Sequence, residues 1–301
     1  MRHSVTIYDS DTAMLERASP FLLAGLDEGE AMLVAVGARK RELLAQALGR
    51  QADAVVWVQP DDLYARPEAA LAAYDAALRR LVRDGAKAVR IFAELPHCDN
   101  AAQFNRWIAY EAIVNRAFEH HPAWILCGYD AREAPEPLLE SALDTHPELL
   151  ADDWTTSTRY HDPTEVVSSR MSRPEPLAGL RPLPFEGGPR GFRQALNAEL
   201  TAAGVGPHEA ENMLIAAGEV FANAKHHGGE TVSVIVGRAG DGFVCEISDN
   251  GPGIDDPLAG FLPPRPEDAH GAGLWVARQL TRQLELVPAH NRAGASVRLW
   301  I

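Results

Sequence analysis

The stretch GEVFANAKHHGG, residues 218–229, decides how the last third of this 301-residue chain folds. Glu219, Asn223 and His227 recur every four positions, and this spacing puts their side chains on one face of a helix. The apolar residues between them face elsewhere and can join a core. A row of polar groups on an otherwise buried helix either meets solvent or lines a site.

A second motif, SDNGPGI at residues 248–254, follows an apolar run that predicts a buried strand. Asp249 ends the strand, and Gly251 and Gly253 stand in the turn that follows. Taken alone, this is ordinary turn chemistry. The same glycines could also let the backbone lie against a ligand, because glycine adopts conformations closed to other residues.

A third motif, HGAGLWVARQL at residues 270–280, places Gly271 and Gly273 directly before an amphipathic helix. Alone, such a helix entry is a weak signal for phosphate binding. Backbone N–H groups and the helix dipole do favour anions at a helix N-terminus. The functional interpretation therefore depends on the order in which the three motifs occur.

In this order and spacing, the motifs resemble the N, G1 and G2 boxes of the GHKL ATPase superfamily. That superfamily includes histidine kinases, gyrase, MutL and the anti-sigma-factor kinases of the RsbW type. The resemblance covers about residues 190–301 and implies an α/β sandwich of the GHKL (Bergerat) type. The element pattern (two helices, a hairpin, a loop, a helix and a closing hairpin) predicts one mixed sheet under helices.

The resemblance also implies that this domain binds ATP and Mg²⁺. Asn223 would offer its amide oxygen to Mg²⁺, a hard ion that takes oxygen ligands. Glu219, one turn earlier, would orient or deprotonate the attacking group. Asp249 would accept a hydrogen bond from the adenine amino group, and Gly251 and Gly253 would let the loop lie against the nucleotide.

The phosphate end of the implied site is formed by the third motif. Gly271, Gly273 and Leu274 would bring backbone N–H groups to phosphate at the start of the helix. Residues 255–270 would form a lid over ATP, with Arg265 as a phosphate contact.

Within the superfamily, the chain is most similar to the anti-sigma serine kinases. His227 fits the Asn-Ala-x-x-His form of their N box, and we expect it to cap the helix or lie in the core. A histidine kinase would carry its phosphoacceptor on a long upstream helix, but the candidate His161 is followed by Pro163, which disrupts a helix. The chain also stops at Ile301, directly after the last predicted strand, so we expect no transducer domain.

The expected function is a signalling regulator whose ATPase domain phosphorylates a serine or threonine of an antagonist protein. The expected partners are a sigma factor, an anti-anti-sigma protein of the STAS type, or both, and a homodimer stays open. Two alternatives also stay open. One is a histidine-kinase-like protein, and the other is ATP-dependent sequestration of a sigma factor without phosphoryl transfer.

The N-terminal half shows a different pattern, in which short apolar runs alternate with helical segments. The predicted strands are residues 5–8, 31–36, 54–58, 88–92 and 123–129. Runs that are apolar on both faces predict a largely parallel sheet covered by helices. The sequence thus predicts a domain at 1–155, a proline-rich linker at 156–189 and the ATPase domain at 190–301.

The segments HSVTIYDSDTAML (3–15), CGYD (127–130) and THPELL (145–150) resemble the MEDS sensory domain, which is related to RecA-like folds. The resemblance spans about residues 3–155 and implies a sensory role for a small, unknown ligand. The segment VGARKREL (36–43) lacks the Gly-Lys-Ser/Thr of a phosphate loop, so we expect no nucleotide hydrolysis there.

Open parallel sheets bind ligands at the ends of their strands, and a sensory pocket is expected there. The candidates are His3, Cys127, Tyr129 and His146. Each also has an ordinary structural explanation, since a buried cysteine or tyrosine commonly serves packing alone.

Composition narrows the class of partner and the setting. Asp and Glu number 42 against 28 Lys and Arg, for a net charge of −14, which argues against nucleic acid or an anionic membrane as partner. The N-terminus lacks the pattern of a signal peptide, and no apolar run is long enough to span a membrane. The three cysteines are widely spaced, which fits a reducing, cytoplasmic setting.

Overall fold

The computed structural model describes residues 1–95, 101–170, 177–228, 231–264, 271–287 and 294–301. The chain divides into two compact units, Met1–Met171 and Ser172–Ile301. The division falls inside the stretch where the sequence predicts a linker.

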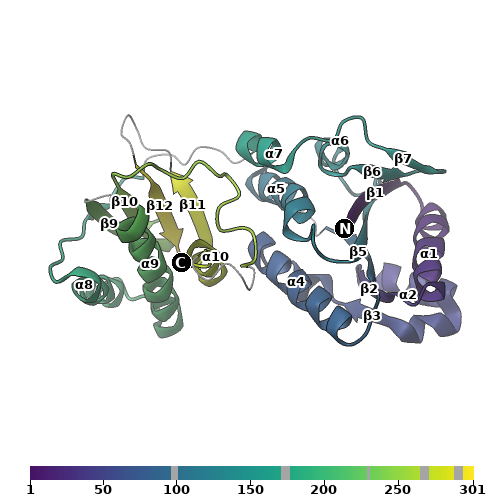
Figure 1. Ribbon diagram of the computed structural model, residues 1–301, viewed down its shortest axis with the longest axis horizontal. Coiled ribbons are helices and arrows are strands. Elements are labelled where there is room, and N and C mark those ends of the chain that lie inside the picture. Colours follow the sequence, from purple (N-terminus) through teal and green to yellow (C-terminus); the bar gives the residue numbers. More distant parts are fainter. Residues whose placement is uncertain (96–100, 171–176, 229–230, 265–270, 288–293) are drawn as a thin grey trace. The chain divides into compact units, whose positions relative to one another are not determined.

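The first unit is built on a seven-stranded sheet (Figure 1). Its strands are β1 (Arg2–Tyr8), β2 (Ala31–Ala35), β3 (Val55–Val58), β4 (Val89–Glu94), β5 (Ala123–Asp130), β6 (Glu148–Leu150) and β7 (Trp154–Thr156). They lie in the order β3-β2-β4-β5-β1-β6-β7, and every pairing is parallel except that of β6 with β7. The prediction of a parallel α/β domain is confirmed.

Helices cover both faces of this sheet. They are α1 (Asp11–Asp27), α2 (Ala38–Leu48), α3 (Pro60–Leu63), α4 (Pro67–Arg83), α5 (Ala101–Ala117), α6 (Glu136–Thr145) and α7 (Pro163–Arg170), with a 3₁₀ turn η1 (Gly49–Ala54). Figure 1 shows α1 and α2 on one face and α4, α5 and α7 on the other. Because α7 packs against α5, residues 163–170 continue the first unit beyond the expected boundary at 155.

Local signals explain where these helices begin. The Ser10 hydroxyl accepts a hydrogen bond from the Ala13 N–H at 3.2 Å and so caps α1. Pro67 occupies the first turn of α4, where its missing N–H costs nothing. Among the described residues, none of the helices is long and apolar enough to cross a membrane.

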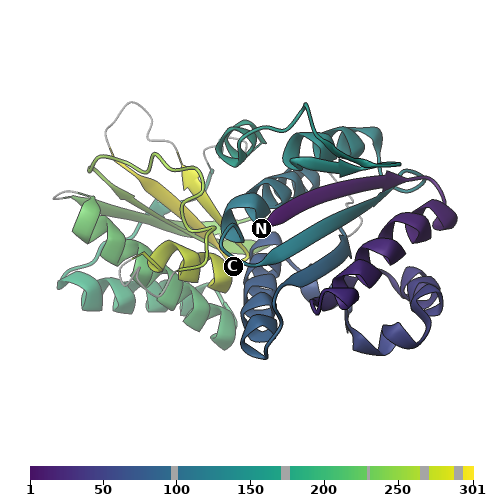
Figure 2. The same ribbon diagram turned by 45° about the vertical axis from the view of Figure 1, so that its right-hand side comes forward.

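The second unit is a five-stranded sheet with three helices on one face (Figure 2). The strands are β8 (Arg181–Pro182), β9 (Val232–Ala239), β10 (Gly242–Asp249), β11 (Gln283–Val287) and β12 (Ser296–Trp300), and the helices are α8 (Gly188–Ala202), α9 (Pro207–His227) and α10 (Gly273–Leu280). The strand order is β11-β12-β10-β9-β8.

The pairings in this second sheet correct one expectation. Every pairing among the described strands is antiparallel, so the prediction of a mixed sheet is wrong. The physical reason is that β9 and β10 form a hairpin and β12 returns between β10 and β11, which leaves no parallel neighbours. Burial in β9 alternates, as expected of an antiparallel sheet with one covered face.

Aromatic rings pack helix α9 against α8 and the loop that precedes α8. The rings of Phe192 and Phe221 stack with centroids 4.5 Å apart and an interplanar angle of 11°. Phe185 meets both rings edge-on at 5.5 Å. Phe221 is 1% exposed, so the apolar face of α9 is committed to the core.

Removing this anchor tests the assignment of the apolar face. We expect Phe221→Ala to lower the free energy of unfolding of the second unit by about 3–5 kcal/mol, the usual cost of deleting a buried phenylalanine ring. Hydrogen exchange of the α9 and β10 amides, read by mass spectrometry, measures the change within this unit. Lys225→Ala, at an exposed position one turn later, is the control and should shift protection by less than about 0.5 kcal/mol. Equal protection in the two variants would contradict the assignment.

Candidate functional site

The polar face of α9 meets the start of α10. A Cβ built on Gly273 would lie 3.0 Å from Nδ2 of Asn223 and 3.2 Å from Oε2 of Glu219. The first turn of α10 therefore approaches the carboxylate and the amide at a distance that only glycine permits without displacement of one of them. Gly271, just before this turn, is exposed.

The carboxylate of Asp249, at the end of β10, is oriented by its own loop. Its Oδ1 accepts hydrogen bonds from the N–H of Gly251 at 2.9 Å and of Ala295 at 3.2 Å. A Cβ on Gly228 would lie only 2.3 Å from the Asp249 Cγ, so the carboxylate packs directly on the backbone that ends α9. Oδ1 accepts both hydrogen bonds, and these bonds fix the orientation of the carboxylate and thus the direction of Oδ2.

The loop after Asp249 requires glycine twice. A Cβ on Gly251 would lie 2.6 Å from both the Cα of Gly228 and the carbonyl oxygen of His227. Gly253 has a φ of 97°, a conformation that side chains disfavour. The N–H of Asn250 donates to the Gly228 carbonyl at 3.1 Å, so the loop and the end of α9 form one connected structure.

The described part of the predicted lid, up to residue 264, is anchored to α10. The Arg278 guanidinium lies 3.6 Å from the centroid of the Phe261 ring and donates to the Ala259 carbonyl at 3.3 Å. Gly260 has a φ of 75°, and a Cβ there would lie 2.7 Å from the Leu274 Cβ. Leu274 also packs on the core of the unit, so its side chain is structural while its backbone opens α10.

Two further residues predicted for this unit are Arg265 and His227. Arg265 lies outside the described residues. His227 is exposed in the last turn of α9, so the expectation that it lies in the core is wrong. A histidine there, next to His226 and Lys225, is favoured by the negative end of the helix dipole.

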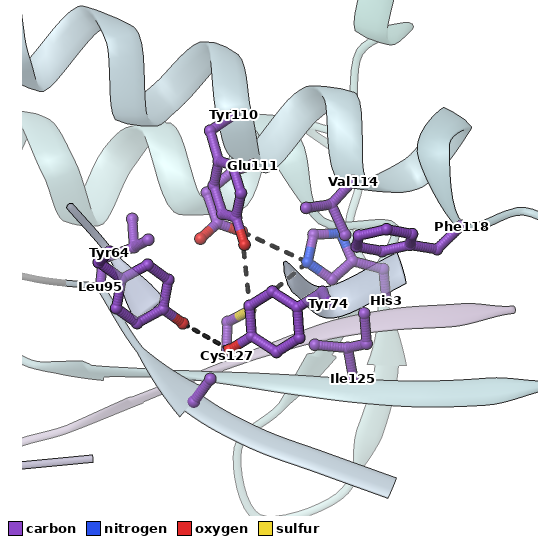
Figure 3. Close-up of a pocket in the computed structure, with 11 residues that line it drawn as sticks. His3, Tyr64, Tyr74, Leu95, Tyr110, Glu111, Val114, Phe118, Ile125 and Cys127 are labelled. Carbon is purple, nitrogen blue, oxygen red and sulfur yellow. Dashed lines mark hydrogen bonds and ion pairs between the residues drawn. The ribbon is translucent and has the colours of Figure 1, made fainter. Parts of the chain in front are cut away.

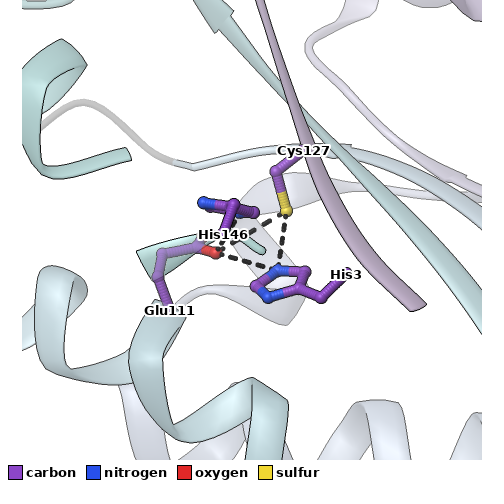
Figure 4. Close-up of side chains that lie close together, drawn as sticks. All are labelled: His3, Glu111, Cys127 and His146. Atoms are coloured by element: carbon purple, nitrogen blue, oxygen red, sulfur yellow. Dashed lines mark hydrogen bonds and ion pairs between the residues drawn. The ribbon is translucent and has the colours of Figure 1, made fainter. Parts of the chain in front are cut away.

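In the first unit, the structure brings together His3, Cys127 and His146, three of the four predicted sensory residues, and adds Glu111 from α5 (Figure 4). Oε2 of Glu111 lies 3.3 Å from Nε2 of His3 and 3.2 Å from Nε2 of His146. The Cys127 sulfur lies 3.4 Å from the same nitrogen of His3 and 3.6 Å from Oε2 of Glu111. We call these four residues the His–Glu–Cys cluster.

Strand alternation explains the meeting of His3 with Cys127, and it corrects the expected location. Val5 pairs with Cys127 and His3 with Ile125, so these side chains share the sheet face that α5 covers. His3 is the second residue of β1 and Cys127 is central in β5, so the cluster does not lie at the carboxyl ends of the strands. The pleat directs both side chains under α5 rather than out of the sheet edge.

Glu111 was missed by the sequence analysis, although a signal was present. It is the one charged residue in the run Ile108–Val114, whose other members are all buried. A carboxylate inside such an apolar run requires a compensating partner. The fourth predicted residue, Tyr129, is buried and meets the His146 ring edge-on at 6.1 Å.

A cavity of about 10 Å³ adjoins the cluster, a size on the scale of one water molecule (Figure 3). His3, Glu111 and Cys127 form part of its wall, and aromatic rings form much of the rest. The hydroxyl groups of Tyr64 and Tyr74 lie 2.7 Å apart beside it. The cavity is thus small, and both aromatic rings and polar groups line it.

Burial shapes the protonation of the cluster. Burial and the neighbouring His146 lower the pKa of His3 to about 4, against the opposing effect of Glu111. Burial would raise the pKa of Glu111, but the hydrogen bonds and charges of the two histidines outweigh it and bring that pKa to about 2. Burial, together with the Glu111 carboxylate, raises the pKa of the Cys127 thiol well above its usual value. The cluster at neutral pH therefore contains a carboxylate and a thiol.

The carboxyl edge of the same sheet holds a separate group of charges. Nζ of Lys40 lies 2.9 Å from a carboxylate oxygen of Glu94 and 3.1 Å from one of Asp130, and the Tyr8 hydroxyl also donates to Glu94. Lys40 stands in the segment where a RecA-like ATPase would bind phosphate. The Lys40 ammonium group is therefore already paired with two acidic side chains.

Comparison with protein families assigns the class of the second unit. The family model described as "Histidine kinase-like ATPase domain" matches residues 189–301. The model "MEDS: MEthanogen/methylotroph, DcmR Sensory domain" matches residues 2–147. The chain therefore contains a MEDS sensory domain fused to a histidine kinase-like ATPase domain.

Comparison with individual proteins adds little. No curated protein matches the chain. Among solved structures, the NMR structure of the histidine kinase domain of the E. coli osmosensor EnvZ is similar, at 21% sequence identity and a TM-score of 0.25. The match covers 43% of this chain and 91% of that one.

The contact between α9 and α10 predicts a specific effect of a single methyl group. We expect Gly273→Ala to weaken ATP binding at least tenfold, or about 1.4 kcal/mol, because its Cβ would push against Asn223 and Glu219. Gly218→Ala is the matched control, since a Cβ there meets nothing within 4 Å. Isothermal titration of both variants with Mg·ATP makes the comparison, and equal affinities would show that the contact does not belong to a nucleotide site.

Proposed function

We propose that the second unit binds Mg·ATP between the polar face of α9, the loop after β10 and the start of α10. Asn223 supplies an amide oxygen to Mg²⁺, a ligand type suited to this ion. Asp249 accepts a hydrogen bond from the adenine amino group through the oxygen left free by its loop. The N–H groups at Gly273 and Leu274 face the phosphates, where the helix dipole also favours negative charge.

One observation carries this proposal. Gly273 lies so close to Asn223 and Glu219 that a Cβ would stand 3.0 Å and 3.2 Å from their polar atoms. A helix N-terminus, a magnesium-type ligand and a carboxylate are thereby brought to one point, which is the arrangement needed at the phosphate end of a nucleotide.

We further propose that the ATPase domain transfers phosphate to a serine or threonine of an antagonist protein, with Glu219 as the base. Glu219 is exposed, so a hydroxyl from a partner protein can reach it. The antagonist would be of the anti-anti-sigma STAS type and the regulated partner a sigma factor, in the cytoplasm. The MEDS domain would control this output by binding a small ligand.

A histidine-kinase-like activity is the second candidate, because His161 is available at the surface. Its side chain is 59% exposed, and its Nδ1 lies 3.8 Å from Oε2 of Glu165. It stands, however, before α7, which spans only Pro163–Arg170, so it lacks the long helix that presents a phosphoacceptor histidine. Acid treatment of labelled protein separates the two, since phosphohistidine is acid-labile and phosphoserine is stable.

Loss of the magnesium ligand should weaken nucleotide binding. We expect Asn223→Ala to weaken Mg·ATP at least tenfold, about 1.4 kcal/mol, because a metal ligand is removed. Asn197→Ala, at an exposed position of α8, is the matched control and should bind as the unmodified protein does. Fluorescence titration with an ATP analogue measures both, and unchanged binding by Asn223→Ala would remove Asn223 from the site.

Replacing the proposed base, Glu219, should impair phosphate transfer but leave Mg·ATP binding nearly unchanged. We expect Glu219→Gln to keep Mg·ATP affinity within about threefold while phosphate transfer to the antagonist falls 10²–10⁴-fold, roughly the usual contribution of a general base. Glu211→Gln, exposed on the same helix, is the control. If transfer persists in Glu219→Gln, another group is the base. If the unmodified protein binds a sigma factor in the presence of ATP and transfers nothing, sequestration is the function.

A further inference from the structure

The His–Glu–Cys cluster takes no part in the proposed nucleotide site. Its four ligand atoms all lie within 4.8 Å of one another. His3, Glu111, Cys127 and His146 are 2%, 2%, 7% and 0% exposed. Polar groups buried this completely are costly unless they are compensated, so the question is what compensates them.

The partners of His3 decide which of its nitrogens faces the cluster. Nδ2 of Asn115 donates to the carbonyl oxygens of Thr145 at 2.8 Å and of Ala112 at 3.2 Å. Its Oδ1 consequently faces Nδ1 of His3, at 3.2 Å, and accepts a hydrogen bond from it. The proton of the neutral ring is therefore on Nδ1, and the lone pair of Nε2 points into the cluster.

The same holds for His146. Its Nδ1 donates to the Ala142 carbonyl oxygen at 2.7 Å, so Nε2 is the nitrogen that faces the cluster. This Nε2 is fully buried and stands 3.2 Å from Oε2 of Glu111. Nε2 of both imidazole rings, the Glu111 carboxylate and the Cys127 sulfur thus face one another inside the domain. Histidines whose outer nitrogen is held by a carbonyl or amide oxygen are typical of metal ligands.

Four of the six spacings among these atoms match those expected around a single ion, and the other two are within 4.8 Å. A tetrahedral Zn²⁺ with bonds of about 2.0–2.1 Å to nitrogen and oxygen and about 2.3 Å to sulfur sets N···O edges of about 3.3–3.4 Å and edges to sulfur of about 3.6 Å. The observed distances from Glu111 Oε2 to the two histidines are 3.3 Å and 3.2 Å. Those from the Cys127 sulfur are 3.4 Å to His3 and 3.6 Å to Glu111.

We propose that His3, Glu111, Cys127 and His146 bind one divalent transition-metal ion of the zinc type inside the sensory domain. On binding, the Cys127 S–H bond breaks, its proton leaves to solvent and a metal–sulfur bond forms, with no change in oxidation state. The two charges of the ion balance the thiolate and the carboxylate, so the buried site becomes neutral. Nitrogen and sulfur ligands select this class of ion over Mg²⁺ and Ca²⁺, which take oxygen ligands.

The test uses the full-length protein, stripped of metal by a chelator and kept reduced. Zn²⁺ is titrated in competition with a chromophoric chelator, and Co²⁺ is added in a parallel experiment as a spectroscopic probe. We expect one ion per chain, a thiolate-to-cobalt absorption band, and no competition from millimolar Mg²⁺. These measurements involve no nucleotide, so their failure leaves the proposed ATP site untouched. Absence of binding, or binding without the thiolate band, overturns the proposal.

Matched cysteine variants locate the ion. We expect Cys127→Ala to lose the cobalt band and at least about 100-fold in Zn²⁺ affinity, while Cys245→Ala and Cys98→Ala retain both. Retention of the band in Cys127→Ala overturns the proposal. If Cys127→Ala does not fold, the double variant Cys98→Ala/Cys245→Ala tests the same point. Cys127 is its sole thiol. This variant keeps the band if the proposal holds and loses it if the ion lies elsewhere.

Discussion

Helix α9 has to satisfy two opposed demands, and the second unit depends on how it does so. One face carries Phe221, stacked on Phe192 at 4.5 Å, and is committed to the core. The other face carries Glu219 and Asn223 and meets the glycine at the start of α10. Because the packed face fixes the orientation of the helix, the two polar side chains face α10. Rigid placement of this kind is what phosphoryl transfer requires of a protein.

The first unit solves a different problem, that of polar groups deep in a parallel α/β core. The His–Glu–Cys cluster lies between the sheet and α5, and hydrogen bonds to Asn115 and Ala142 turn the outer nitrogens of both histidines away from it. The charges at the carboxyl edge, by contrast, neutralise one another through Lys40. The edge where nucleotides bind in related folds is therefore occupied by an ion pair, and the chemically unsatisfied groups lie in the interior.

Much of this could be predicted from the sequence, because the motifs are local. The spacing of Glu219 and Asn223 predicted a shared helix face, and the alternating runs predicted a parallel sheet. The predictions that were wrong concerned features set by long-range pairing of strands and helices. The second sheet proved antiparallel, since the position of β12 between β10 and β11 has no local signature. Glu111 meets His3 only through the packing of α5 on β1, and the placement of His3 away from the strand ends follows from register, which the sequence does not display.

The central claim is that the second unit binds magnesium-bound ATP. Calorimetry on the full-length protein tests this claim directly. Titration with ATP in the presence of Mg²⁺ should give heat that fits one site per chain. GTP should give much less, because guanine has no amino group in the position that Asp249 addresses. Absence of heat with ATP, or equal binding of both nucleotides, would contradict the account.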